Sequence, residues 1–201
     1  MTFQIIVACC NKNGIGLKND IPWHLTSELQ YFKKITCHTT TTIYKNVVVM
    51  GRKTWESIPE KHRPLSDRIN IVLTKNLDYK VPEGVFKCHS LEEVTTILET
   101  IENSSKTNVF LIGGGTLYNE CMEKGLCKKI YLTKIYKKFE CDVFFPKITS
   151  DFMLNTVSDF CEEKGFFNKC VYCISKTIVK SKFTFAMTSF HSIIFYPIWF
   201  C

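Results

Sequence analysis

Short apolar runs alternate along this chain with segments of helical periodicity, and this alternation restricts the fold more than any other feature of the sequence. The segment 25–35 shows the helical pattern, because its apolar residues at 25, 29, 32 and 35 fall on one face of a helix. Strands that alternate with helices favour a largely parallel sheet with both faces covered. The sequence therefore predicts an α/β fold of three layers, with helices flanking a central sheet. The runs of strand length and composition are 3–9, 46–50, 68–73, 108–112, 130–136 and 171–179.

The start of one predicted helix carries a specific signal. Ser90 stands directly before the segment 91–101, and Glu93 follows it by three residues, which is the spacing of a capping box. We therefore expect Ser90 to cap this helix. Further helices are predicted over 52–58 and 116–124.

Residues 1–180 contain no repeat or low-complexity linker, so we expect a single domain followed by an apolar tail at 181–201. Within that tail, 13 of the 19 residues from Phe183 to Cys201 are apolar. A membrane-spanning helix needs about 20 mainly apolar residues, and here polar residues and Pro197 interrupt the run. A docked or disordered extension, or sequence foreign to the domain, is favoured. Membrane contact of the tail is the alternative.

The net charge of +7 comes from 26 basic and 19 acidic residues that are spread evenly. Residues 1–100 carry 13 Lys and Arg against 10 acids, and the remainder carries 13 against 9. Such a distribution lacks the basic arm typical of nucleic-acid binding, so no nucleic acid is expected as a partner. A mildly positive surface suits an anionic small ligand, although scattered surface lysines would give the same charge.

Eleven cysteines suggest a disulfide framework at first sight, but their setting argues against it. The count is odd, Cys9 and Cys10 are adjacent within an apolar run, and no basic segment separates Met1 from that run. Because a secretory signal needs such a segment, we expect a cytoplasmic protein with reduced thiols. Cys170 and Cys173 form a C-x-x-C pair without a second pair or a nearby histidine, so no metal site is expected.

Two glycine-bearing turns follow strand-like runs and open helices. In the first, 113–115, glycines let backbone N–H groups approach a ligand, and the helix start favours an anion. The second turn, Gly51, is followed by Arg52, Lys53 and Thr54. Cations at a helix start oppose the helix dipole by about 0.3–1 kcal/mol, and a bound phosphate would reverse that cost. A plain tight turn and solvated cations are the alternatives.

A third turn bears on the identity of the nucleotide. The run 68–73 ends in Thr74 and Lys75. Folds that bind NAD place an acidic residue near a strand end, where it binds the ribose 2′-hydroxyl. Folds that bind NADP place a cation there, which accommodates the 2′-phosphate. If this turn meets the adenosine ribose, the cofactor is NADPH.

Glu28 is the candidate for handling a proton. It lies between Leu25 and Phe32 on an otherwise apolar helix face. The helix dipole favours a first-turn anion by about 0.3–1 kcal/mol, whereas burial favours the protonated carboxyl by more, and a carboxyl poised in this way can help to deliver a proton. A first-turn acid that only stabilises the helix is the alternative. Trp23, just ahead of the helix, carries an N–H that could fix an ordered water.

Several stretches occur here in a characteristic order: IVA at 6–8, NGIG at 13–16, DIPW at 20–23, VMGRKTWESIP at 49–59, RPL at 63–65, RIN at 68–70, IGG at 112–114 and CDVFFP at 141–146. Together with Glu28, they resemble the dihydrofolate reductase family over residues 3–179 without a large insertion. The resemblance implies a mostly parallel, eight-stranded central sheet flanked by helices. It also implies a monomeric, cytoplasmic oxidoreductase.

The implied reaction is the NADPH-dependent reduction of 7,8-dihydrofolate to 5,6,7,8-tetrahydrofolate. This reaction sustains one-carbon metabolism and thymidylate, purine and glycine synthesis. Enzymes of the family are targets of antifolates. Hydride would pass to C6 of the pterin, and N5 would be protonated through water under the influence of Glu28. In some protists the reductase is fused to thymidylate synthase. This chain is too short to contain that partner, so a fragment of a fusion and a stand-alone form both remain open.

For the substrate, the resemblance makes Glu28 the lone acid of the pterin pocket, supported by Thr133, with Trp23 holding a linking water. Arg68 would bind both oxygens of the α-carboxylate on the glutamate tail. The residues implied to line the substrate cleft are Ile6, Val7, Leu29, Phe32, Ile58, His62, Leu65, Ile112 and Tyr118.

For the cofactor, the resemblance places residues 14–20 in a mobile loop that closes over the site and excludes water. Thr74 and Lys75 would read the 2′-phosphate. The residues implied to contact NADPH are Ala8, Gly14, Ile15, Gly16, Asp20, Arg52, Lys53, Thr54, Leu73, Thr74, Lys75, Gly113, Gly114, Gly115, Thr116 and Leu117.

Two other functions remain open from the sequence alone. A pyrimidine reductase of riboflavin synthesis would share the glycine turns but would not need Glu28 together with Arg68. A non-catalytic folate- or nucleotide-binding module would bind an antifolate without oxidising NADPH. An assay on dihydrofolate separates both from the main hypothesis.

Overall fold

A computed structural model of the chain describes residues 2–39, 44–101, 107–158, 161–163 and 167–176. The tail predicted at 181–201 lies outside the described residues, as do residues 177–179 of the last predicted strand and the side chain of Cys170. The strands of the main sheet are β1 (Phe3–Cys9), β3 (Asn46–Gly51), β4 (Arg68–Leu73), β5 (Val85–Cys88), β6 (Val109–Leu111), β7 (Cys127–Ile135), β9 (Phe152–Val157), β10 (Cys161–Glu163) and β11 (Phe167–Lys176). The helices are α1 (Thr26–Cys37), α2 (Arg52–Ser57), α3 (Leu91–Thr100) and α4 (Gly115–Glu123).

The main sheet is ordered β10-β11-β7-β1-β6-β3-β4-β5, which is a path of eight strands. Its interior strands from β7 to β5 pair in parallel, and β11 pairs antiparallel to β7. The remaining strand, β9, lies beside the end of β11, where Lys176 opposes Phe152, and β10 lies beside its start, where Lys169 opposes Cys161. The predicted α/β fold with a mostly parallel, eight-stranded sheet is therefore confirmed.

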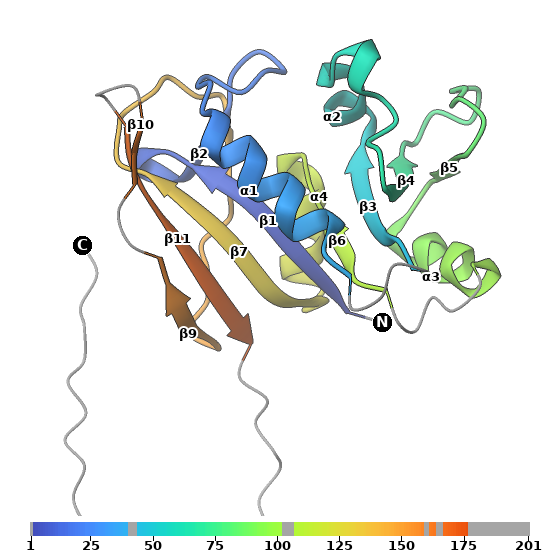
Figure 1. Ribbon diagram of the computed structural model, residues 1–201. Helices are drawn as coiled ribbons and strands as arrows, with labels where there is room; N and C mark the ends of the chain where they lie inside the picture. Colours follow the sequence, from blue (N-terminus) through green and yellow to red (C-terminus); the bar gives the residue numbers. More distant parts are fainter. Residues whose placement is uncertain (1, 40–43, 102–106, 159–160, 164–166, 177–201) are drawn as a thin grey trace, which may run out of the picture.

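Alternate residues of the strands point into two separate cores, which explains why the runs are continuously apolar. Ile5 and Val7 pack with α3 and α4 on one face, through residues such as Leu91. Ile6 packs on the opposite face with Trp55 and the apolar side of α1 and α2. Figure 1 shows α1 crossing the near face of the sheet and α4 behind it. The three predicted layers follow from this arrangement.

The helix signal at Ser90 is confirmed in detail. The Ser90 side chain accepts a hydrogen bond from the Glu93 N–H at 3.3 Å, and the Glu93 carboxylate reaches back to the N–H of His89 at 2.8 Å. In a standard capping box the glutamate accepts from the N–H of the cap residue itself, whereas here Glu93 accepts from the N–H of the preceding residue, His89. Both bonds satisfy backbone donors that the helix start would leave unpaired.

Several short strands were not predicted, because none of them contains an apolar run of typical strand length. The clearest case is the two-stranded sheet of β2 (Gly14–Gly16) and β8 (Val143–Phe144), in which two glycines flank Ile15. β9 is a similar case, because its residues are largely exposed. Short 3-10 helices occupy Asn11–Asn13 and Glu60–His62. Among the described residues, none of the helices has the length and apolar character needed to cross a membrane.

Candidate active site

The carboxyl ends of the parallel strands β1, β3, β4 and β6 meet at one edge of the sheet. Predicted site residues stand at each of these ends: Ala8 in β1, Arg52 after β3, Thr74 after β4 and Ile112 after β6. In parallel α/β sheets, ligands bind at this edge. The fold therefore brings together segments that are far apart in the sequence.

The two glycine-bearing turns are in direct contact at this edge. The Gly51 N–H donates to the Gly113 carbonyl at 2.8 Å, and the Ile112 N–H donates to the Val49 carbonyl at 3.0 Å. Gly113 has φ +135°, and a Cβ there would lie 3.1 Å from Thr54 Oγ1. A larger residue at position 113 would therefore be strained and crowded.

The start of α4 faces the small β2–β8 sheet. A Cβ on Gly115 would lie 2.7 Å from Val143 Cγ1 and 3.9 Å from Ile15 Cδ1. No side chain caps this helix, and its first turn contains no acid. The glycine therefore lets the loop pack closely on a helix start whose positive dipole end is open to an anion.

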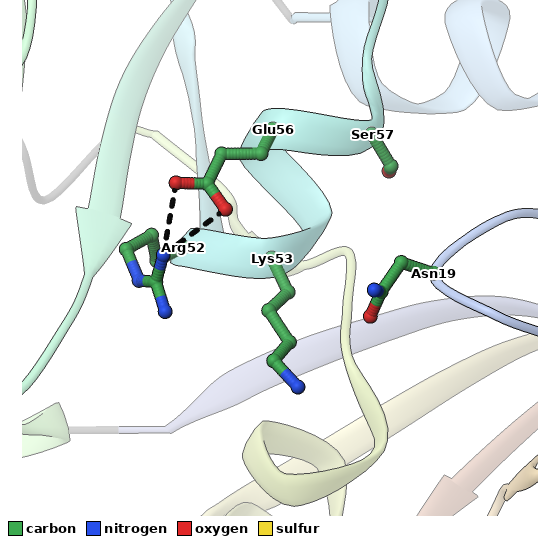
Figure 2. A pocket seen from close by; sticks show the side chains of 5 residues that line it. All are labelled: Asn19, Arg52, Lys53, Glu56 and Ser57. Atoms are coloured by element: carbon green, nitrogen blue, oxygen red, sulfur yellow. Dashed lines mark hydrogen bonds and ion pairs between the residues drawn. The ribbon is translucent and has the colours of Figure 1, made fainter.

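A pocket of about 320 Å³ lies between the loop after β2 and the helix α2. Figure 2 shows Asn19 of the loop facing Lys53 and Ser57 of the helix. Arg52 is paired with the Glu56 carboxylate at 3.0 and 3.2 Å, and it lies 5.8 Å from the centre of the Tyr79 ring. No carboxylate oxygen of the described residues lies within 4.0 Å of the Lys53 ammonium. Of the two predicted phosphate-binding cations, Lys53 is thus the one without a competing ion pair.

The turn after β4 holds Thr74 and Lys75 beside a histidine that the sequence did not single out. Thr74 is buried and its N–H donates to the Cys88 carbonyl at 2.9 Å, whereas Lys75 is exposed. His89 Nδ1 lies 2.7 Å from the Thr74 carbonyl oxygen. Because a carbonyl only accepts, Nδ1 carries the proton and Nε2 is left for another partner. His89 was missed because it follows β5, a strand that was not predicted.

Glu28 is buried, with 9% of its surface exposed, in the first turn of α1. Burial raises the pKa of Tyr31 to about 12, and the negative charge of Glu28 adds to this effect. Burial and the charge of Glu28 also raise the pKa of Tyr118, whose hydroxyl donates to the Ile6 carbonyl at 2.9 Å. Glu28 is therefore buried near aromatic side chains, with Tyr31 and Tyr118 close enough for its charge to act on both.

The start of α1 is held by a second acid that the sequence did not indicate. Glu163 accepts hydrogen bonds from the N–H groups of Thr26 at 2.8 Å and Ser27 at 3.1 Å. It also contacts the Ser27 hydroxyl. Glu163 thus supplies the anion that the helix start favours. Because Glu163 already stabilises the start of α1, the alternative that Glu28 serves only to stabilise this helix is weakened.

Comparison with known proteins shows to which family the chain belongs. A family model described as dihydrofolate reductase matches residues 2–176. The chain belongs to the dihydrofolate reductase family. It is 44% identical over 153 residues to a dihydrofolate reductase of Drosophila melanogaster, covering 76% of this chain and 83% of the relative. It is 41% identical over 170 residues to a dihydrofolate reductase of Aedes albopictus, covering 81% and 91%.

A longer relative matches the same part of the chain. The bifunctional dihydrofolate reductase-thymidylate synthase 2 of Arabidopsis thaliana is 41% identical over 150 residues, which is 73% of this chain but 26% of the relative. The chain therefore spans about a quarter of that bifunctional protein.

Arg68, the predicted receptor of a substrate carboxylate, is a buried cation. It is 8% exposed, its Nε donates to the Ser66 carbonyl at 2.9 Å, and its Nη1 donates to Thr36 Oγ1 at 2.9 Å. The guanidinium lies 5.7 Å from the centre of the Phe32 ring. Burial lowers the pKa of Arg68, and no carboxylate of the described residues lies within 4.0 Å of it. A ligand carboxylate would compensate this buried charge.

The other two residues assigned to the proton-transfer machinery lie in β7 and just before α1. Thr133 is 1% exposed and stands opposite Ala8 in the neighbouring strand β1. Trp23 is 5% exposed, and its ring packs against Phe139 with centroids 5.4 Å apart. Both side chains are therefore buried and packed against neighbouring elements.

Most of the predicted substrate-lining residues share one face of the sheet. Ile6, Phe32, Ile58, Leu65 and Ile112 belong to the core cluster between the sheet and the helices α1 and α2. At the rim of this cluster, Leu29 is 58% exposed and His62 is also exposed. Val7 and Tyr118 instead have their side chains in the cluster with α3 and α4.

Proposed function

We propose that this chain reduces 7,8-dihydrofolate to 5,6,7,8-tetrahydrofolate with NADPH. The observation that carries the proposal is the buried Glu28, whose charge acts on Tyr118 of α4, the helix that begins at the first of the two contacting glycine turns. The relatives named dihydrofolate reductase support the substrate. In the reaction, one hydride is added at C6 of the pterin and one proton at N5.

The residues at the carboxyl edge fit a phosphorylated dinucleotide. The uncapped start of α4 lacks an acid, and Lys53 has no ion-pair partner among the described residues. Thr54, Thr116 and Leu117 stand at the same two helix starts. NADPH, when bound, supplies the hydride. The chain would bind its phosphates through Lys53, Thr54 and the N–H groups at the start of α4.

The protein's own chemistry is positioning and proton control. Arg68 binds the α-carboxylate of the glutamate tail, which fixes the substrate along the α1 side of the cleft. Glu28, supported by Thr133, holds the pterin amino and N3 positions, and Trp23 orders the water that leads toward N5. The loop 14–20, packed on α4 through Ile15, excludes bulk water during transfer.

The test of the proposal is an assay of the full chain with NADPH and dihydrofolate. NADPH oxidation should depend on dihydrofolate and should form tetrahydrofolate in equal amount. Binding of NADPH and an antifolate without oxidation would contradict the enzymatic proposal. Oxidation only with an aminopyrimidine substrate would favour the pyrimidine reductase.

Selection of NADPH over NADH is predicted to depend on Lys75. The exposed Lys75 ammonium follows Thr74 at the end of β4, where the 2′-phosphate is expected. Lys75→Glu should weaken NADPH binding about tenfold or more, because a like charge replaces a favourable one. NADH, which lacks the phosphate, should bind almost as before.

Fluorescence titration of each variant with both dinucleotides measures this selectivity. Lys80→Glu is the matched control, because Lys80 is an exposed lysine five positions further along the same segment. Equal losses of NADPH and NADH affinity in Lys75→Glu would show that Lys75 does not read the phosphate.

The proposal places the enzyme in the cytosol. Eight cysteines whose side chains the structure describes are free thiols, five of them buried between strands and helices. A reducing compartment keeps such thiols unpaired. Fractionation of cells that express the full chain tests this location.

A further inference from the structure

Two cysteines meet beneath the loop 14–20. Cys10 directly follows β1, and Cys141 lies just before β8. Their sulfur atoms are 3.6 Å apart, although 131 positions separate them in the sequence. Cys10 is fully buried, whereas Cys141 is half-buried and so can be reached from solvent.

The space around the two thiols is closed by the base of the loop. A Cβ on Gly14 would lie 2.5 Å from Cys141 Sγ and 2.9 Å from Cys10 Sγ, so only glycine fits there without displacing a sulfur. The Cys10 N–H donates to the Gly14 carbonyl at 2.9 Å. On the other side, the Asp142 N–H donates to the Gly16 carbonyl at 3.0 Å. The dithiol thus lies between the end of β1 and the two strands that anchor the loop.

We propose that Cys10 and Cys141 are a modification site, namely a reversible disulfide formed by exchange with a low-molecular-weight disulfide such as oxidised glutathione. The sulfur atoms need to approach by about 1.5 Å to reach the bond length of about 2.05 Å. Rotation of the two side chains and a small movement of the backbone at Cys141 can supply this shift, because Cys141 lies on the segment between β7 and β8 and not within a strand.

The exchange is balanced in two steps. The Cys141 thiolate attacks oxidised glutathione, forms a mixed disulfide and releases one glutathione thiolate, which takes up the proton. Cys10 Sγ, after losing its proton, then attacks Cys141 Sγ and releases the second glutathione. Two thiols of the protein are oxidised and one glutathione disulfide is reduced to two thiols. Dithiothreitol reverses the reaction.

Reaction at this pair is expected to be slow under reducing conditions. Burial and the neighbouring Cys10 thiol raise the pKa of Cys141 to about 11, so little thiolate is present at neutral pH. Oxidation of the pair by oxidised glutathione should therefore be slow at neutral pH and faster as the pH is raised. Cys121 and Cys127 also interact through their thiols, but both are buried in the core and are not accessible to the oxidant.

The disulfide would fasten β8 to the end of β1 directly under the loop. Because the link closes a segment of 131 positions, it should stabilise the folded protein. It should also hinder displacement of β2, since Gly14 packs on both sulfurs. If the loop opens and closes in each catalytic cycle, which rests on the proposed function, the oxidised protein should turn over more slowly.

The test incubates the full chain with oxidised glutathione and maps its disulfides by mass spectrometry. The expected product lacks two hydrogen atoms and contains a peptide in which Cys10 is linked to Cys141. Its Tm should rise by about 5–15 °C relative to the reduced protein. Cys10→Ser and Cys141→Ser should show neither change. Cys37→Ser removes a half-buried thiol on α1 and should behave as the wild type.

Absence of the Cys10–Cys141 peptide, or glutathione retained on Cys141 alone, would overturn the proposal. The disulfide is detected independently of the reaction, so a failure of the proposed function would leave this result intact. Turnover of the oxidised wild type should fall at least threefold and recover with dithiothreitol. Unchanged turnover in a fully oxidised sample would overturn the link between the disulfide and the loop.

Discussion

Replacement of Glu28 by glutamine is expected to lower turnover about 10²–10⁴-fold at neutral pH, which is the usual contribution of a positioned proton-transfer group. Glu28 is buried in α1, and its charge reaches Tyr31 and Tyr118. Glutamine keeps the size of the side chain and can accept and donate hydrogen bonds, but it cannot hold a carboxyl proton. The loss should therefore fall on the chemical step rather than on NADPH binding, as stopped-flow single-turnover assays can show.

The pH profile separates proton delivery from a structural role. If the variant is slow because N5 is not protonated, solvent protons should replace the missing path. The ratio of wild-type turnover to Glu28→Gln turnover should then fall about tenfold for each unit by which the pH is lowered. Glu99→Gln, which changes an exposed acid on α3, is the matched control and should be neutral. Turnover of Glu28→Gln equal to that of the wild type would remove Glu28 from the mechanism.

Much of the fold could be predicted because the central strands β1, β3 and β6 are buried on both faces and so are rich in apolar residues. The predicted runs 3–9 and 68–73 coincide with β1 and β4, and the predicted start of α3 at Ser90 is correct. Short strands escaped prediction for a physical reason. β2 consists of Gly-Ile-Gly, and only its pairing with β8, more than a hundred residues away, makes it a strand. The sequence of residues 14–16 alone does not indicate that pairing.

The same distinction applies to the site. Glycine turns, cations and a lone acid on an apolar helix face were visible, because each is unusual in its own local context. Glu163, His89 and the Cys10–Cys141 contact were not, because their partners come from distant segments. The ion pair between Arg52 and Glu56 was also overlooked, although its spacing on the helix α2 is a known signal for such pairs.

Removal of the Arg68 guanidinium is expected to raise the KM for dihydrofolate about 30-fold to 4,000-fold, because truncation of one partner of a buried charge pair costs about 2–5 kcal/mol. Arg68 is 8% exposed and is oriented by Ser66 and Thr36, so its direction does not depend on the substrate. Arg68→Gln leaves a polar side chain that cannot bind a carboxylate through two charged N–H groups. Steady-state kinetics with dihydrofolate measures the change.

The identity of the recognised group can be tested with a truncated substrate. A dihydropteridine without the glutamate tail should have a high KM in the wild type, and Arg68→Gln should leave that KM nearly unchanged. Arg63→Gln is the matched control, because Arg63 lies five positions earlier but has its own carboxylate partner, Glu60, at 3.2 Å. A similar loss with tailed and tailless substrates would mean that Arg68 acts by holding Thr36 and α1 in place. A loss restricted to the tailed substrate would identify Arg68 as the receptor for its α-carboxylate.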